Sequence, residues 1–138
     1  MKKLLIAGFV LVVLFSCNKD KYQTKPQISL KSVSAKVVPV NGILNVVLSF
    51  TDKEGDISDS MYIKKIRLNK TVVTTLRDSL KYKIADFPDY PKGEIELALQ
   101  YQNHLISAFD PPPIPGSNPS ADQPDTLLLK FWIRDKAG

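Results

Sequence analysis

The sequence predicts an all-β protein, an antiparallel β-sandwich of six to seven strands, with a small closed barrel as the alternative. Apolar residues recur at every second position in several short segments, which is the pattern of a half-buried strand. Asn, Asp, Pro and Gly residues bound these segments, as expected of turns. No stretch has the apolar spacing of a long helix, so a second sheet is needed to cover the apolar face of the first.

Three segments alternate most clearly, and each places four side chains on one face. They are residues 43–50, 94–101 and 126–134. The residues predicted to face inward are Leu44, Val46, Leu48 and Phe50; Ile95, Leu97, Leu99 and Tyr101; and Leu127, Leu129, Phe131 and Ile133. Weaker strand patterns occupy residues 27–38, 61–69, 70–76 and 79–87.

The start of the chain is typical of a secreted lipoprotein. Two lysines precede residues 4–15, about a dozen apolar residues, whereas a membrane-spanning helix takes about 20. Residues 14–17, Leu-Phe-Ser-Cys, resemble the sequence read by lipoprotein signal peptidase. We therefore expect residues 1–16 to be a cleaved lipoprotein signal peptide. Cys17, the only cysteine, would carry the lipid, with acyl chains such as palmitate, and no disulfide is expected.

Behind the predicted anchor, the chain divides into a tether and one domain. Residues 17–26 are polar and predict a flexible tether, and residues 27–138 have the length of a single domain. Residues 18–20, Asn-Lys-Asp, resemble a short form of the export signal of some Gram-negative surface lipoproteins. We expect a protein anchored by lipid in the cell outer membrane, with surface exposure as a further hypothesis. The formal charge of +5 is dispersed and mixed with acids, so no nucleic-acid partner is expected.

The segment of residues 103–125, here the Pro-rich segment, contains six of the ten prolines and predicts a long surface connection. Its Pro-Pro-Pro-Ile-Pro run favours polyproline II, which aromatic-lined grooves bind. A variable insertion without a binding role is the other interpretation.

Two further fragments, LSFTDKEGDIS (48–58) and FWIRDKAG (131–138), resemble parts of the immunoglobulin-like domains of bacterial surface lipoproteins. The resemblance implies an immunoglobulin-like sandwich with residues 43–50 as its second strand and residues 127–134 as its sixth. Such domains usually continue into one more strand, so we expect either a longer sequence after Gly138 or a strand supplied by a partner.

An immunoglobulin-like arrangement would also create a candidate metal site. Its second and sixth strands run in the same direction, so the loops that follow them meet at one end. That would bring Asp52, Glu54 and Asp56 close to Asp135, with Gly55 allowing a tight turn. Calcium takes six to eight oxygen ligands, so the four carboxylates predict a calcium site, with a plain surface turn as the alternative.

Catalytic motifs do not stand out in the sequence. The single histidine, His104, has no nucleophile at a motif spacing and is expected to contact solvent, and Glu94 and Glu96 share the outer face of a strand. Trp132 is expected on an outer face, where it could stack on a sugar or pack on its own sheet. We therefore expect a non-catalytic envelope module that binds a protein or glycan or acts as an accessory subunit. The alternative is a hydrolase of envelope or extracellular polymer.

Overall fold

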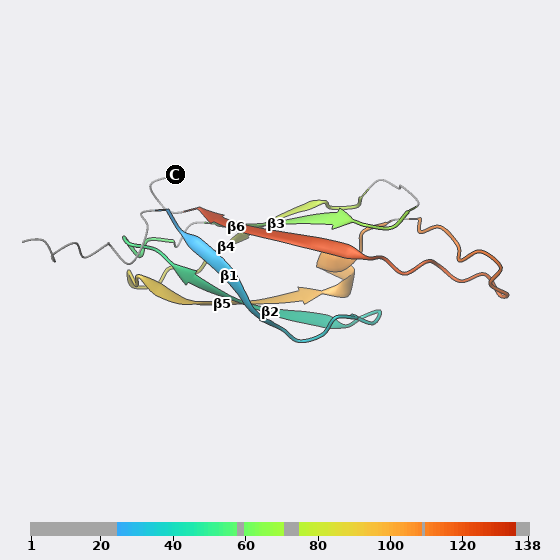
Figure 1. Cartoon of the computed structure of the whole chain (residues 1–138), viewed down its shortest axis with the longest axis horizontal. Helices are drawn as coiled ribbons and strands as arrows, with labels where there is room; N and C mark the ends of the chain where they lie inside the picture. The colour runs from blue at the N-terminus through green and yellow to red at the C-terminus, as the bar shows by residue number, and fades with distance from the viewer. Residues whose placement is uncertain (1–24, 58–59, 71–74, 109, 135–138) are drawn as a thin grey trace, which may run out of the picture.

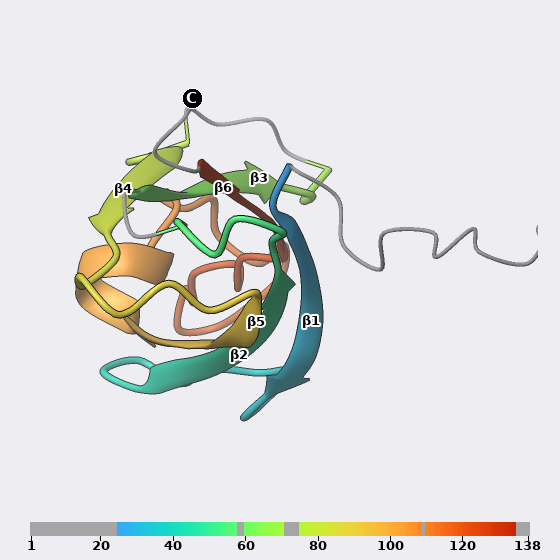
Figure 2. The ribbon, with the colours of Figure 1, turned by 90° about the vertical axis from the view of Figure 1, so that its left-hand side faces the viewer.

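The computed structural model describes residues 25–57, 60–70, 75–108 and 110–134 as two antiparallel three-stranded sheets packed face to face (Figures 1 and 2). One sheet has the order β1-β2-β5 and the other β4-β3-β6. The strands are β1 (Gln27–Val33), β2 (Ile43–Thr51), β3 (Ser60–Arg67), β4 (Ser79–Lys83), β5 (Lys92–Gln100) and β6 (Leu127–Arg134). The predicted all-β class is therefore confirmed.

The core lies between the two sheets, where the alternating pattern predicted it. Leu44, Val46, Leu48 and Phe50 are buried on β2, and Leu99 is buried on β5. The second sheet contributes its own inward rows, which are Met61 and Ile63 on β3, and Leu129, Phe131 and Ile133 on β6. Full burial of one such side chain contributes about 1.5–3 kcal/mol, so these rows hold the two layers together.

The weaker strand predictions need correction. β1 ends at Val33 instead of residue 38, and β4 ends at Lys83, so residues 84–87 form no ladder. The predicted strand 70–76 is wrong for its described residues, which form turns and irregular backbone, while residues 71–74 lie outside the described part. Side-chain alternation alone does not determine whether a segment pairs with a neighbouring strand. The described residues of 34–38, 70–76 and 84–87 do not pair with one.

The Pro-rich segment has more structure than a plain connection. It begins inside a π-helix, η2 (Tyr101–Leu105), so Tyr101 is half-buried there instead of ending the preceding strand. Farther along, Ile114 N–H donates to the Ala121 carbonyl at 2.8 Å, which folds the segment back on itself. The resulting arm extends beyond the end of the sandwich (Figure 1, orange).

Part of the predicted organisation lies outside the described residues. This holds for the signal peptide, for Cys17 and most of the tether, and for Asp135. In the portion of the chain that the structure describes, no helix has the length and apolarity needed to span a membrane.

Candidate functional site

Asp52 is the first residue after β2, and the fold buries it completely. Its backbone N–H donates to the carbonyl of Pro91 at 2.9 Å, which ties the end of β2 to the chain that leads into β5. Asp52 begins residues 52–56, here called the acidic turn. A carboxylate in such a position loses its hydration, so it needs partners from the protein or from a bound ion.

Gly55 gives the acidic turn its shape. Its φ of +74° is one that glycine adopts without strain, and a Cβ atom at this position would lie 2.7 Å from the backbone nitrogen of Tyr90. The turn then returns so that Asp56 N–H donates to Oδ2 of Asp52 at 3.1 Å. The predicted tight turn at Gly55 is therefore present.

Three of the four predicted ligands come together in the acidic turn. Carboxylate oxygens of Asp52, Glu54 and Asp56 all lie within 4.8 Å of one another. Asp52 is buried, Asp56 is half-buried and Glu54 is exposed, so the cluster runs from the interior to solvent. The fourth predicted ligand, Asp135, lies outside the described residues.

The atom that best indicates a ligand is Oδ1 of Asp52. This oxygen is buried and has no hydrogen-bond partner, and the whole of Asp52 is 0% exposed. A buried charge without compensation costs several kcal/mol, whereas a bound cation would remove that cost. Carboxylates on a turn with access to water suit calcium, which accepts irregular sets of oxygen ligands. The residues present therefore fit a calcium ion.

A pocket of about 320 Å³ lies next to the acidic turn. Its walls include Phe50 and Phe87, whose rings are 6.1 Å apart, and Tyr90, which is 57% exposed. Because Gly55 packs against the Tyr90 backbone, the acidic turn supports one rim of this pocket. The pocket is mainly apolar and aromatic, which suits binding more than charge-driven chemistry.

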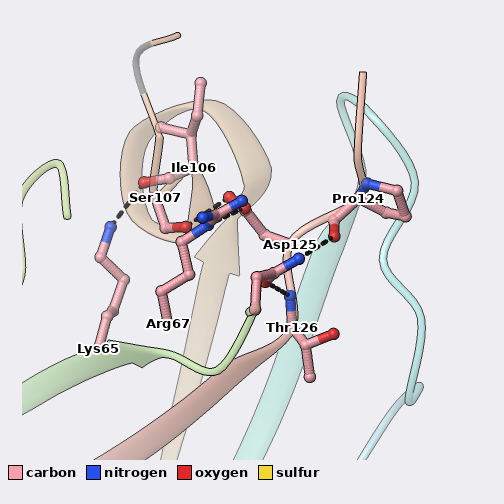
Figure 3. A network of polar contacts seen from close by, with 8 residues as sticks. Lys65, Arg67, Ile106, Ser107, Pro124, Asp125 and Thr126 are labelled. Carbon is pink, nitrogen blue, oxygen red and sulfur yellow. Dashed lines mark hydrogen bonds and ion pairs between the residues drawn. The ribbon is translucent and has the colours of Figure 1, made fainter. Parts of the chain in front are cut away.

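A second cluster of charges lies inside the sandwich, at the end of β3 (Figure 3). Lys65 and Arg67 occupy inward positions, and Lys65 Nζ donates to the Ile106 carbonyl at 2.7 Å. Arg67 Nε donates to one carboxylate oxygen of Asp125 at 2.5 Å, and the Ser107 hydroxyl donates to the other. Burial, followed by the nearby Arg77 charge, lowers the pKa of Lys65 from its ordinary value, while Asp125 and Asp78 oppose the shift.

This cluster closes the base of the Pro-rich segment. Asn69 adds two bonds there: its Nδ2 donates to the Pro124 carbonyl at 2.9 Å, and its Oδ1 accepts from Thr126 N–H at 2.8 Å (Figure 3). This role was not predicted from the sequence. The alternation of Met61, Ile63, Lys65 and Arg67 along β3 would have placed both cations on the inner face.

His104 is half-buried and lies in the π-helix, where the sequence predicted a surface connection. Its Nδ1 accepts the N–H of Gln100 at 2.9 Å, and its ring meets the Tyr82 ring edge-on at 5.6 Å. Burial, then the charges of Lys65 and Arg77, lower the pKa of His104. Tyr82 lies on the inner face of β4, and burial raises the pKa of its hydroxyl.

The remaining candidates lie on the outer faces of the sheets. Glu94 and Glu96 are exposed on β5 as predicted, and Glu94 forms an ion pair with Lys31. Trp132 is 40% exposed on the outer face of β6 and stacks on Tyr62. The acids therefore share a solvated sheet face, and the tryptophan packs on its own sheet.

Comparison of the chain with protein-family models, with curated protein sequences and with solved structures gives no match. Its function is therefore inferred from the geometry of these sites and from the sequence.

Proposed function

We propose that the chain is a non-catalytic, calcium-binding module of the cell envelope, an immunoglobulin-like sandwich tethered to the outer membrane by lipid on Cys17. The observation that carries the proposal is the buried, unpartnered Oδ1 of Asp52, a residue that belongs to a cluster of three carboxylates. The module would bind a protein or glycan, or serve as an accessory subunit, and calcium would be part of its fold.

The strand order supports the immunoglobulin-like assignment. In such domains the second strand pairs with the fifth, and the third with the sixth, in opposite sheets. Here β2 pairs with β5, β3 pairs with β6 and β1 lies beside β2 in the same way, whereas β4 differs because it pairs with β3 and not with the fifth strand. The lipid anchor and the envelope location rest on the sequence around Cys17.

Calcium in the acidic turn would hold more than the turn itself. Asp52 is bonded through its backbone to Pro91, and Gly55 packs on Tyr90, so an ion would fix the chain entering β5. Since Tyr90 lines the adjacent pocket, the ion would also set the shape of the pocket rim. Ligand binding at that pocket would then depend on calcium.

Thermal unfolding of the purified protein tests the calcium site. We expect a melting temperature higher by about 10 °C in millimolar calcium than in chelator, if calcium exceeds its dissociation constant a hundredfold. In Asp52→Asn the amide oxygen still accepts the Asp56 N–H, but the buried charge is gone. This variant should lose the calcium response and, in chelator, be at least as stable as the wild type.

A matched control removes a carboxylate elsewhere. Asp122 is exposed in the Pro-rich segment, so Asp122→Asn should respond to calcium like the wild type. An identical melt in calcium and chelator would contradict the proposal, and so would a calcium response that survives Asp52→Asn.

A further inference from the structure

The outer face of the β4-β3-β6 sheet, here called the basic face, gathers positive charge that is scattered in the sequence. Successive side chains on a strand point to opposite sides of the sheet, and Met61 and Ile63 fix the inner side. The positions on this side are Ser60, which is buried, with Tyr62, Lys64 and Ile66 on β3; Ser79, Lys81 and Lys83 on β4; and Leu128, Lys130, Trp132 and Arg134 on β6. Among these strand residues there are five cations and no acid.

The strand register arranges most of these residues in three rows that cross β4, β3 and β6. The rows are Lys83, Ser60 and Arg134; Lys81, Tyr62 and Trp132; and Ser79, Lys64 and Lys130. Neighbouring strands are about 4.8 Å apart and alternate residues on one strand about 6.7 Å apart. The five cations therefore share an area on the order of 10 by 14 Å. Along the sequence the same charges are dispersed, so this density was not predicted.

The opposite sheet lacks this bias. Its outer face carries acids and bases together, since Lys31 pairs with Glu94, and Lys92 and Glu96 lie on the same strand face. On the basic face, Lys64 and Lys130 are exposed and make no ion pair with the described part of the chain. The positive charge is therefore a property of one face.

The middle row places two aromatic rings, Tyr62 and Trp132, in contact with each other and with neighbouring cations. Tyr62 and Trp132 are stacked, with centroids 5.5 Å apart and planes 8° from parallel. Lys81 Nζ lies 5.6 Å from the centre of the Tyr62 ring, and the Arg134 guanidinium lies 5.3 Å from it. The Tyr62 ring is thus occupied by its neighbours and supports the cations around it.

We propose that the basic face binds an acidic polysaccharide, whose anionic groups pair with the lysine and arginine side chains. Charge complementarity requires a polyanion, and the choice of a polysaccharide rests on the envelope location proposed above. A single-stranded nucleic acid would need several open aromatic faces for its successive bases, whereas Tyr62 is already covered and Trp132 is the only exposed ring among these strand residues. A lipid surface would favour several apolar side chains that project outward, whereas here Leu128 is exposed but Trp132 lies against Tyr62.

Trp132 is the only tryptophan of the chain, so its fluorescence reports directly on this face. Polygalacturonate is titrated into the purified full chain at low and high salt, with dextran as a neutral polymer. We expect a saturable fluorescence change with polygalacturonate, weaker at high salt because exposed charges are screened, and none with dextran. Single-stranded DNA and phosphatidylglycerol vesicles are titrated in parallel, and vesicle binding is compared with that of Lys64→Gln/Lys130→Gln, because a lipid on Cys17 would insert equally in both proteins. Tighter binding of DNA, tighter vesicle binding that is lost in Lys64→Gln/Lys130→Gln, or no binding of polygalacturonate would overturn the proposal.

Matched variants distinguish the effect of the basic face on binding from the effect of the net charge of the protein. Lys64→Gln/Lys130→Gln should bind polygalacturonate about tenfold more weakly than the wild type. Lys64→Arg/Lys130→Arg, which keeps both positive charges, should bind it like the wild type. Lys36→Gln/Lys92→Gln removes the same charge away from the basic face and should bind like the wild type. Equal weakening in both glutamine variants would contradict the proposal. The calcium melt, repeated on each variant, tests the acidic turn separately, so the two proposals can fail independently.

Discussion

His104 is kept neutral by its surroundings, because burial and then the cations of Lys65 and Arg77 disfavour its charged form, while Nδ1 accepts a backbone hydrogen bond. Its pKa in the folded protein is therefore below the ordinary value of 6.5. A histidine of this kind contributes its stability at pH values above 6.5. That stability is lost as the pH falls through the folded pKa, because the unfolded chain takes up the proton first.

We therefore predict that acidification from pH 7.5 to pH 5 lowers the free energy of unfolding less in His104→Asn than in the wild type. The asparagine Oδ1 can take the place of Nδ1 as acceptor but does not titrate. The difference should stay below about 1 kcal/mol, since solvent screens a half-buried group. Urea unfolding at several pH values measures it. Parallel pH profiles for the two proteins would show that the titrating group lies elsewhere.

At the level of the strands, β2 and β5 meet at a close contact between Gly93 and Phe50. A Cβ on Gly93 would lie 2.7 Å from two atoms of the Phe50 ring, which is buried and faces the core. Glycine is therefore present because the ring covers the neighbouring strand at this point.

Gly93→Ala should lower the free energy of unfolding by about 1–3 kcal/mol, the usual range for overpacking. Phe50→Leu removes the ring, so Gly93→Ala added to that variant should cost much less than it does alone. The double-mutant cycle, measured by urea unfolding, isolates this contact. Additive effects of the two substitutions would mean that the strand, and not the ring, rejects the alanine.

Strands β2, β5 and β6 were predictable because each buries one face and exposes the other, which leaves a clear alternation. Residues 84–87 misled the prediction because Ile84 and Phe87 are apolar for another reason: they line the pocket. Lys65 and Arg67 were missed because charge was taken to mean exposure, whereas both are compensated inside the fold by Ile106 and Asp125.

The acidic turn was predictable in part. Its three carboxylates are close in sequence, and Gly55 indicates a tight turn, so the clustering of the carboxylates could be predicted from residues 52–56 alone. The burial of Asp52 was not predictable, because it depends on the contact with Pro91, some forty residues away in the chain. The basic face likewise depends on the register between β4, β3 and β6, which no single segment contains.

For the whole molecule, the sequence around Cys17 predicts where the protein resides. The wild type expressed in a bacterial cell should carry an acylated N-terminal Cys17, seen by mass spectrometry, and should fractionate with the outer membrane. Cys17→Ser should abolish acylation and leave an uncleaved precursor or a soluble product. A wild-type protein whose N-terminus lies elsewhere, or lacks acyl chains, would contradict the anchor and with it the proposed location.

The closed base of the Pro-rich segment has a consequence for how this fold can change. Asp125 joins the two ends of the segment through the Ser107 hydroxyl, and Asn69 holds the C-terminal end at Pro124 and Thr126, so the arm beyond them leaves and re-enters the sandwich at a fixed point. Lengthening a loop that is already closed adds only about 0.6 kcal/mol per doubling. The tip near Gly116 is exposed, and a side chain there would meet open space. New sequence can therefore be grafted at this tip, and the sandwich can acquire or exchange a recognition element without rebuilding its core.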